Sequence, residues 1–105
     1  METILFIDTS SNKEIVVGLR SNGKKFEKEL KIDQNKAQVT LPMIDKIFKE
    51  HNVELSEITS VRVKTGPGSF TGVRVGISIA NALSFVLKVP INEKKHGELA
   101  EPTYE

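Results

Sequence analysis

The chain has 105 residues, of which 38% are apolar and 28% charged, with a formal net charge of +1 and no cysteine. This length predicts one soluble domain with a modest core, and the near-neutral charge argues against a protein that coats nucleic acid. The composition excludes disulfides and cysteine-based metal sites, and without a basic, apolar leader or a run of roughly 18 apolar residues we expect a cytoplasmic protein with no membrane attachment.

The first third of the chain predicts three antiparallel strands in succession. Residues 3–7 form an apolar, partly β-branched run that ends at Asp8, which favours a buried strand. A second apolar run covers residues 14–20 and is followed by the Asn-Gly pair at 22–23, which tolerates the positive φ values of a tight hairpin. Residues 26–32 then alternate apolar side chains with charges, as edge strands do when one face is in water.

A helix is predicted over about residues 35–51, and Pro42 is expected to kink it or delay its start. Its apolar side chains form two stripes, of which one is enough to dock the helix on a sheet. The second stripe therefore predicts either a wider core contact or a surface for a partner. His51 is expected to cap the helix, where a cation favours the helix dipole, and not to bind a metal. The docking stripe consists of Ala37, Leu41, Ile44 and Phe48, and the second stripe of Val39, Met43 and Ile47.

The rest of the chain completes the pattern of a mixed α/β domain. Residues 58–64 predict a fourth strand, residues 71–88 a second helix that Pro90 stops, and residues 89–92 a short last strand. The element order is therefore β-β-β-α-β-α-β. Residues 93–105 lack periodicity and contain four glutamates, so we expect them to form a flexible acidic tail.

The glycine-rich segment at 65–76 lies between the fourth strand and the second helix. Its glycines either shape a turn and let the helix pack closely, or they cradle a phosphate at a helix N-terminus. The lysine of a Walker loop is missing, and small residues recur every four positions along the helix, as close packing requires. The residues that would lie near a phosphate are Asp8, Ser10, Gly66, Gly68 and Ser69.

The second helix carries more apolar surface than one small core can use. Apolar residues cover about half of its circumference, and Ile77 and Phe85 lie on the other half. The helix is therefore expected to be sandwiched or to have a partner. Neither Ser10 nor Ser69 has an evident base, and the histidines lack the spacing of a zinc site, so no catalytic or metal-binding residue is assigned.

Three segments are distinctive: Ile-Leu-Phe-Ile-Asp-Thr-Ser at 4–10, Leu-Pro-Met-Ile at 41–44 and Gly-Pro-Gly-Ser-Phe-Thr-Gly-Val-Arg-Val-Gly-Ile at 66–77. Together they resemble the TsaB (YeaZ) family in order and spacing over residues 1 to about 92. The resemblance implies one actin-like, ribonuclease-H-like lobe of the ASKHA class at residues 1–92, with the second lobe of the family absent. In the bacterial machinery that makes threonylcarbamoyladenosine in tRNA, family members are scaffolds that bind TsaD, which carries the metal and the transferase chemistry.

The resemblance implies a non-catalytic scaffold that binds a TsaD-like subunit through its two helices. A TsaE-like ATPase and a second copy of the chain are further candidate partners, tRNA is expected to be reached only indirectly, and ATP and metal are expected on the partner subunits. The alternatives are an actin-like enzyme that binds Mg-ATP, or a purely structural homodimer. The family often has a histidine where this chain has Lys36-Ala37-Gln38. The residues expected to contact the partner are Val39, Met43, Ile47, Phe48, Phe70, Arg74, Ile77, Asn81 and Phe85.

Overall fold

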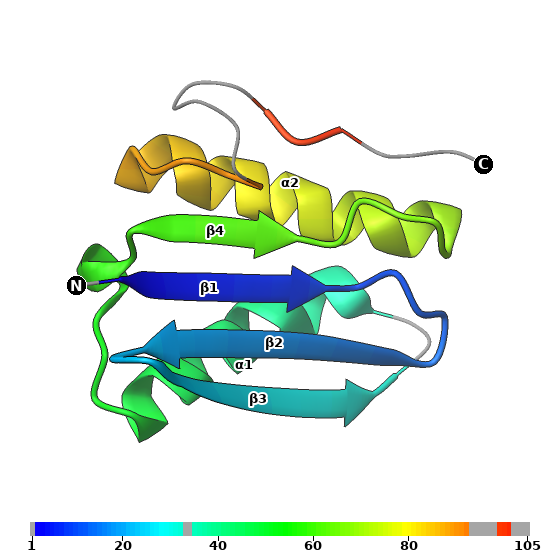
Figure 1. Cartoon of the computed structure of the whole chain (residues 1–105). Coiled ribbons are helices and arrows are strands. Elements are labelled where there is room, and N and C mark those ends of the chain that lie inside the picture. The colour runs from blue at the N-terminus through cyan, green and yellow to red at the C-terminus, as the bar shows by residue number, and fades with distance from the viewer. Residues whose placement is uncertain (1, 33–34, 93–98, 102–105) are drawn as a thin grey trace.

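The computed structural model describes residues 2–32, 35–92 and 99–101. It consists of a four-stranded sheet with two helices packed on one of its faces, while the opposite face is open toward the viewer in Figure 1. In chain order the elements are β1 (Thr3–Asp8), β2 (Glu14–Ser21), β3 (Lys24–Lys31), α1 (Lys36–Glu50), the short 3-10 helix η1 (Leu55–Glu57), β4 (Ser60–Val63) and α2 (Phe70–Leu87).

The strands lie in the order β3-β2-β1-β4. β2 pairs antiparallel with both β1 and β3, and β4 pairs parallel with β1, so the sheet is mixed. The hairpin between β2 and β3 turns at Asn22 and Gly23, whose φ values of 55° and 78° are those of a two-residue turn. The predicted mixed α/β fold, its three-strand meander and its hairpin are therefore confirmed.

The predicted last strand is reduced to one bridge, in which Ile91 lies parallel to Val61. The side chain of Asn92 continues the ladder beyond this bridge. Its Oδ1 accepts a hydrogen bond from the Val63 N–H at 2.8 Å, and its Nδ2 donates to the Val63 carbonyl at 2.9 Å. Asn92 has a φ of 49°, so the backbone leaves the strand conformation here. One amide side chain thus covers the edge of β4 that a longer fifth strand would pair.

α1 lies against both the sheet and α2. This double contact buries most of the second stripe and the C-terminal half of the docking stripe, Ile44 and Phe48. Met43, Ile47 and Phe48 are 9%, 0% and 2% exposed and belong to the core. The second stripe is therefore a wider core contact. This corrects the prediction that these three side chains meet a partner, because side chains enclosed by their own chain have no surface to offer. Val39 is half-buried against the same core. Ala37 and Leu41 are exposed, Leu41 by 50%, which corrects their assignment to the docking stripe.

His51 occupies the C-cap of α1, as predicted. Its ring also stacks on Phe26 of β3, with ring centroids 3.7 Å apart and an angle of 18° between the planes. The stacked pair joins the end of α1 to the edge strand of the sheet.

Thr9 fixes α2 on the end of the sheet. The side chain is fully buried, and its hydroxyl donates to the Gly72 carbonyl while accepting a hydrogen bond from the Gly76 N–H at 2.9 Å. These two groups are the i and i+4 partners of one helical hydrogen bond, so the hydroxyl lies against the ladder itself. A Cβ at Gly76 would lie 2.5 Å from the Thr9 Oγ1, and one at Gly72 would collide with the Thr9 carbonyl oxygen. The glycine repeat therefore serves the packing of α2 on the loop after β1.

We expect Gly76→Ala to destabilise the chain by about 1–3 kcal/mol, although alanine is the better helix former by about 1 kcal/mol. The added methyl group must displace the buried Thr9 hydroxyl, whose hydrogen bonds then weaken. Urea unfolding measures the change, and Ser78→Ala, at an exposed position of the same helix, is the control. A Gly76→Ala variant as stable as the wild type would show that α2 does not need the contact with Thr9.

The open face of the sheet contains one pair of like charges with a predictable pH dependence. A hydrogen bond with the Glu29 carboxyl, together with desolvation and the charge of Glu29, raises the pKa of Glu14 above its ordinary value. Between the ordinary and the raised pKa, the folded chain binds more protons than the unfolded chain. The stability that Glu14 contributes is therefore present at low pH and is lost as the pH rises through the raised value.

Replacing Glu29 with glutamine should remove the loss of stability that Glu14 causes as the pH rises. We expect Glu29→Gln to be more stable than the wild type at pH 7, with a smaller difference at pH 4, where Glu14 is largely protonated in both chains. Urea unfolding at the two pH values measures the effect, with the exposed Glu2→Gln as control. A gain that is equal at both pH values would contradict the link to Glu14.

Candidate functional site

The two loops predicted to lie near a phosphate meet at the end of the sheet. The Ser69 N–H donates a hydrogen bond of 2.7 Å to the carbonyl of Ser10, which joins the loop after β1 to the loop before α2. A Cβ at Gly68 would lie 2.6 Å from the Ser10 carbonyl oxygen, so this approach needs glycine. Gly66 has a φ of 125°, a conformation that also favours glycine. The structure therefore brings Ser10, Gly68 and Ser69 together, and it explains the glycines by turn shape and close contact.

Asp8 and Ser10 are engaged with each other within the same loop. The Asp8 Oδ1 accepts hydrogen bonds from the Ser10 N–H at 2.9 Å and from the Ser10 Oγ at 2.5 Å. Ser69 is the N-cap of α2, where its Oγ accepts from the Gly72 N–H at 3.2 Å. Each of these contacts stabilises a turn or a helix end. The one hydroxyl–carboxylate pair among these three side chains, Ser10 with Asp8, closes the turn in which both residues lie.

Lys36 is a contributor that the sequence analysis did not single out. It lies in the first turn of α1 and is only 8% exposed. Its ammonium group donates to the carbonyls of Thr9, at 3.2 Å, and of Ser11, so it holds the loop after β1 from α1, close to Gly72 of α2. The only sequence signal was the departure from the family pattern, in which a histidine often stands near this place. In this chain Lys36 acts on the backbone of the loop after β1.

The residues predicted to contact a partner from α2 fall into three environments. Arg74 is exposed and Phe85 is 79% exposed, so both are on the surface. Ile77 is 6% exposed and belongs to the core, which corrects its assignment to a partner surface. Asn81 is half-buried beneath residues 99–101, and the side chain of Phe70 lies outside the described residues. The outer face of α2 consists of Arg74, Ser78, Ala82, Phe85 and Val86, all of them exposed.

The segment predicted to be a flexible tail is only partly described. Its residues 93–98 and 102–105 lie outside the described part of the chain. Residues 99–101 lie against α2, and Ala100 among them is buried at 3% exposure.

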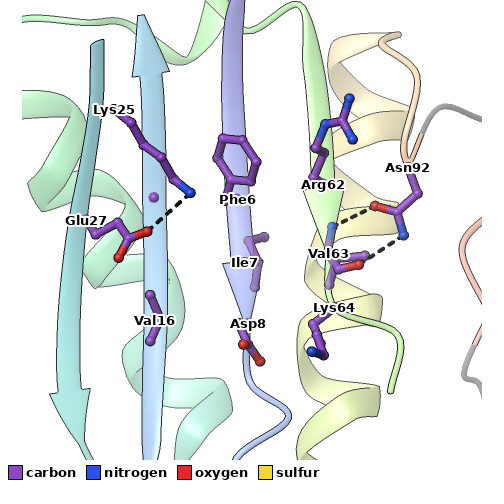
Figure 2. A pocket seen from close by; sticks show the side chains of 11 residues that line it. Phe6, Ile7, Asp8, Val16, Lys25, Glu27, Arg62, Val63, Lys64 and Asn92 are labelled. Carbon is purple, nitrogen blue, oxygen red and sulfur yellow. Dashed lines mark hydrogen bonds and ion pairs between the residues drawn. The ribbon is translucent and has the colours of Figure 1, made fainter. Parts of the chain in front are cut away.

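The open face of the sheet carries a hollow of about 420 Å³. Figure 2 shows the ring of Phe6 at its centre, with Lys25 and Glu27 on one side and Arg62 on the other. The Lys25 Nζ lies 4.7 Å from the centroid of the Phe6 ring and 3.2 Å from the Glu27 carboxylate. Asp8 lies at one end of the hollow, and its lining contains no imidazole and no hydroxyl group. The hollow can contact a polar group or a flat apolar one, and its lining offers no hydroxyl or imidazole nucleophile.

Metal ligands are also sparse. Across residues 2–32, 35–92 and 99–101, no three histidine or acidic side chains lie close enough together to hold a metal ion.

Known proteins share both the sequence and the fold. The TsaB protein of Buchnera aphidicola subsp. Baizongia pistaciae, a tRNA threonylcarbamoyladenosine biosynthesis protein, is 36% identical over 90 residues, which cover 86% of this chain and 40% of the relative. TsaB of Buchnera aphidicola subsp. Schizaphis graminum is 38% identical over 98 residues, 86% of this chain and 42% of the relative. YeaZ from Pseudomonas aeruginosa superposes with a TM-score of 0.83 at 35% identity, over 87% of this chain and 42% of YeaZ.

The chain thus spans about two fifths of the length of these relatives. The superposition with YeaZ confirms the predicted actin-like lobe, and these matches confirm the resemblance to TsaB. A family model described as TsaD, tRNA N6-adenosine threonylcarbamoyltransferase, matches residues 31–99, which is more than half of the 105 residues. The chain therefore belongs to the family of TsaD, the tRNA N6-adenosine threonylcarbamoyltransferase, and its sequence and fold resemble those of the TsaB and YeaZ proteins.

Proposed function

We propose that the chain is a non-catalytic subunit that binds a TsaD-type partner and so supports the threonylcarbamoyladenosine modification of tRNA. The relatives that cover most of the chain are named for the biosynthesis of this nucleoside, and the matching family model is that of the transferase. In this proposal the partner supplies the metal, the nucleotide and the chemistry, a TsaE-type ATPase joins the complex, and tRNA is contacted through the partner.

The observation that carries the proposal is the apolar pair on the outer face of α2. Phe85 and Val86 are 79% and 71% exposed, although most apolar side chains of α2 are at least half-buried. Neighbouring exposed side chains of this size offer a partner a compact apolar surface. Arg74 and Ser78 extend the same face toward the start of the helix, which gives the surface a polar rim. α1 adds only the exposed part of its docking stripe, Ala37 and Leu41, because the core occupies Ile44, Ile47 and Phe48.

The hydrogen bonds at the end of the sheet support an accessory role. Asp8, Ser10 and Ser69 hold the two loops and the start of α2, and the hollow on the open face lacks an imidazole or hydroxyl group. We place this complex in the cytoplasm, where tRNA is modified. In the described parts of the chain, no helix is both long enough and apolar enough to cross a membrane.

One specific observation favours a second candidate function, the binding of Mg-ATP. The loops that carry Asp8, Ser10, Gly68 and Ser69 are in direct contact, as a phosphate-binding arrangement in an actin-like lobe would require. Calorimetric titration of the free chain with Mg-ATP separates the two candidates. Micromolar binding would favour the nucleotide-binding alternative over the accessory subunit.

We expect Phe85→Asp to weaken binding to the TsaD-type subunit of the same organism by at least about 100-fold, since burying a carboxylate in an apolar contact is costly. Calorimetric titration of the two subunits measures the affinity. Phe85 is exposed in the free chain, so its replacement should leave the fold intact, which circular dichroism checks. Replacing Ile77 or Phe48 would not be informative, because both side chains lie in the core.

The matched control is Leu55→Asp, which makes the same kind of change at a 38% exposed leucine of η1, an element apart from α2. This variant should bind as tightly as the wild type. If Phe85→Asp and Leu55→Asp both bind normally, the outer face of α2 is not the docking surface. Light scattering of the free chain and of Phe85→Asp tests whether a second copy uses this face instead.

A further inference from the structure

Residues 99–101, which follow the end of α2 by more than ten residues, lie against one side of α2 at Asn81. Residues 99–101 run beside the helix (Figure 1). Ala100 is 3% exposed and counts among the core residues, whereas its neighbours Leu99 and Glu101 are exposed, Leu99 by 57%. Only the methyl group of the segment is therefore enclosed, and a larger side chain at this place would have to displace its surroundings.

The side chain of Asn81 holds this segment by its backbone. Its Nδ2 donates to the Ala100 carbonyl at 3.1 Å, and its Oδ1 accepts from the Ala100 N–H at 2.8 Å. Both polar groups of one residue are thus paired by one amide, as they would be by a neighbouring strand. The contact recognises an extended backbone with a small side chain, and Asn81 is the residue of α2 that provides it.

The seated segment lies next to the proposed docking surface. Asn81 precedes Phe85 by four residues and follows Arg74 by seven, and side chains at these spacings share one side of a helix. A partner that covers the outer face of α2 from Arg74 to Phe85 would therefore meet residues 99–101 at its margin.

We propose that residues 99–101 form an intramolecular cover on α2, which must leave the Asn81 flank before a TsaD-type subunit docks fully. This inference rests on the proposed function, because it concerns the regulation of that same surface. Two hydrogen bonds and one buried methyl group hold Ala100, and so small a contact can open locally while the rest of the fold persists. A closed cover lowers the apparent affinity for the partner by the fraction of molecules in which it is open.

Two variants of the full chain should release the cover from its two sides. Asn81→Leu removes both hydrogen bonds to Ala100, and Ala100→Arg places a long side chain where only a methyl group fits, without changing α2. We expect hydrogen exchange of the residue 100 amide to become about 5- to 10-fold faster in both variants. We expect both to bind the TsaD-type subunit about 5- to 10-fold more tightly than the wild type.

Leu99→Arg is the matched control, because it adds the same charge to the same segment at a side chain that is already exposed. It should change neither the exchange rate nor the affinity. Unprotected exchange at Ala100 in the wild type would overturn the cover. An unchanged or weaker affinity of Asn81→Leu and Ala100→Arg for the TsaD-type subunit would also overturn the cover. If the wild type binds that subunit in the same experiment, the proposed function stands. If neither the wild type nor any variant binds, the proposed function fails, and the cover fails with it.

Discussion

The hydroxyl of Thr9, buried against the hydrogen-bond ladder of α2, is the contact on which the arrangement of the helices depends. It donates to the Gly72 carbonyl and accepts from the Gly76 N–H, so it fixes α2 along its axis and in its rotation. The two glycines follow from this contact, because a methyl group at either would collide with Thr9. Lys36 holds the same loop through its carbonyls from the side of α1. Both helices thus hold one five-residue loop, α2 through the Thr9 side chain and α1 through the loop carbonyls.

The rotation of α2 decides which of its apolar side chains remain free. With Gly72 and Gly76 turned toward Thr9, Val73 and Ala80 enter the core, while Phe85 and Val86 point away from the sheet. α1 has a smaller excess, because it packs against both the sheet and α2 and leaves Ala37 and Leu41 exposed near its start. α2, with Phe85 and Val86, therefore presents the larger exposed apolar side chains that a partner could use.

Local patterns predicted the elements well, because alternation, helical spacing and the Asn-Gly turn act between near neighbours in sequence. They predicted the burial of α1 poorly, since periodicity shows that Met43 and Ile47 share a face but not how many neighbours that face has. The roles of Thr9 and Lys36 depend on contacts across 63 and 27 residues of sequence, and no local pattern marks them. In the candidate site, the contact between the Ser10 and Ser69 loops was predictable, because one loop follows the first strand and the other begins the second helix.

Two asparagines make the same contact in settings that give it different consequences. Asn92 pairs with the N–H and carbonyl of Val63, and Asn81 with those of Ala100. Val63 belongs to β4, which is also paired with β1 along its other edge, so the contact of Asn92 closes a sheet that is fixed already. Ala100 lies outside the sheet and the helices, and a single buried methyl group accompanies its hydrogen bonds. Equal hydrogen bonds therefore make a permanent edge in one place and a releasable cover in the other, because the surrounding contacts, not the amide, set the free energy of opening.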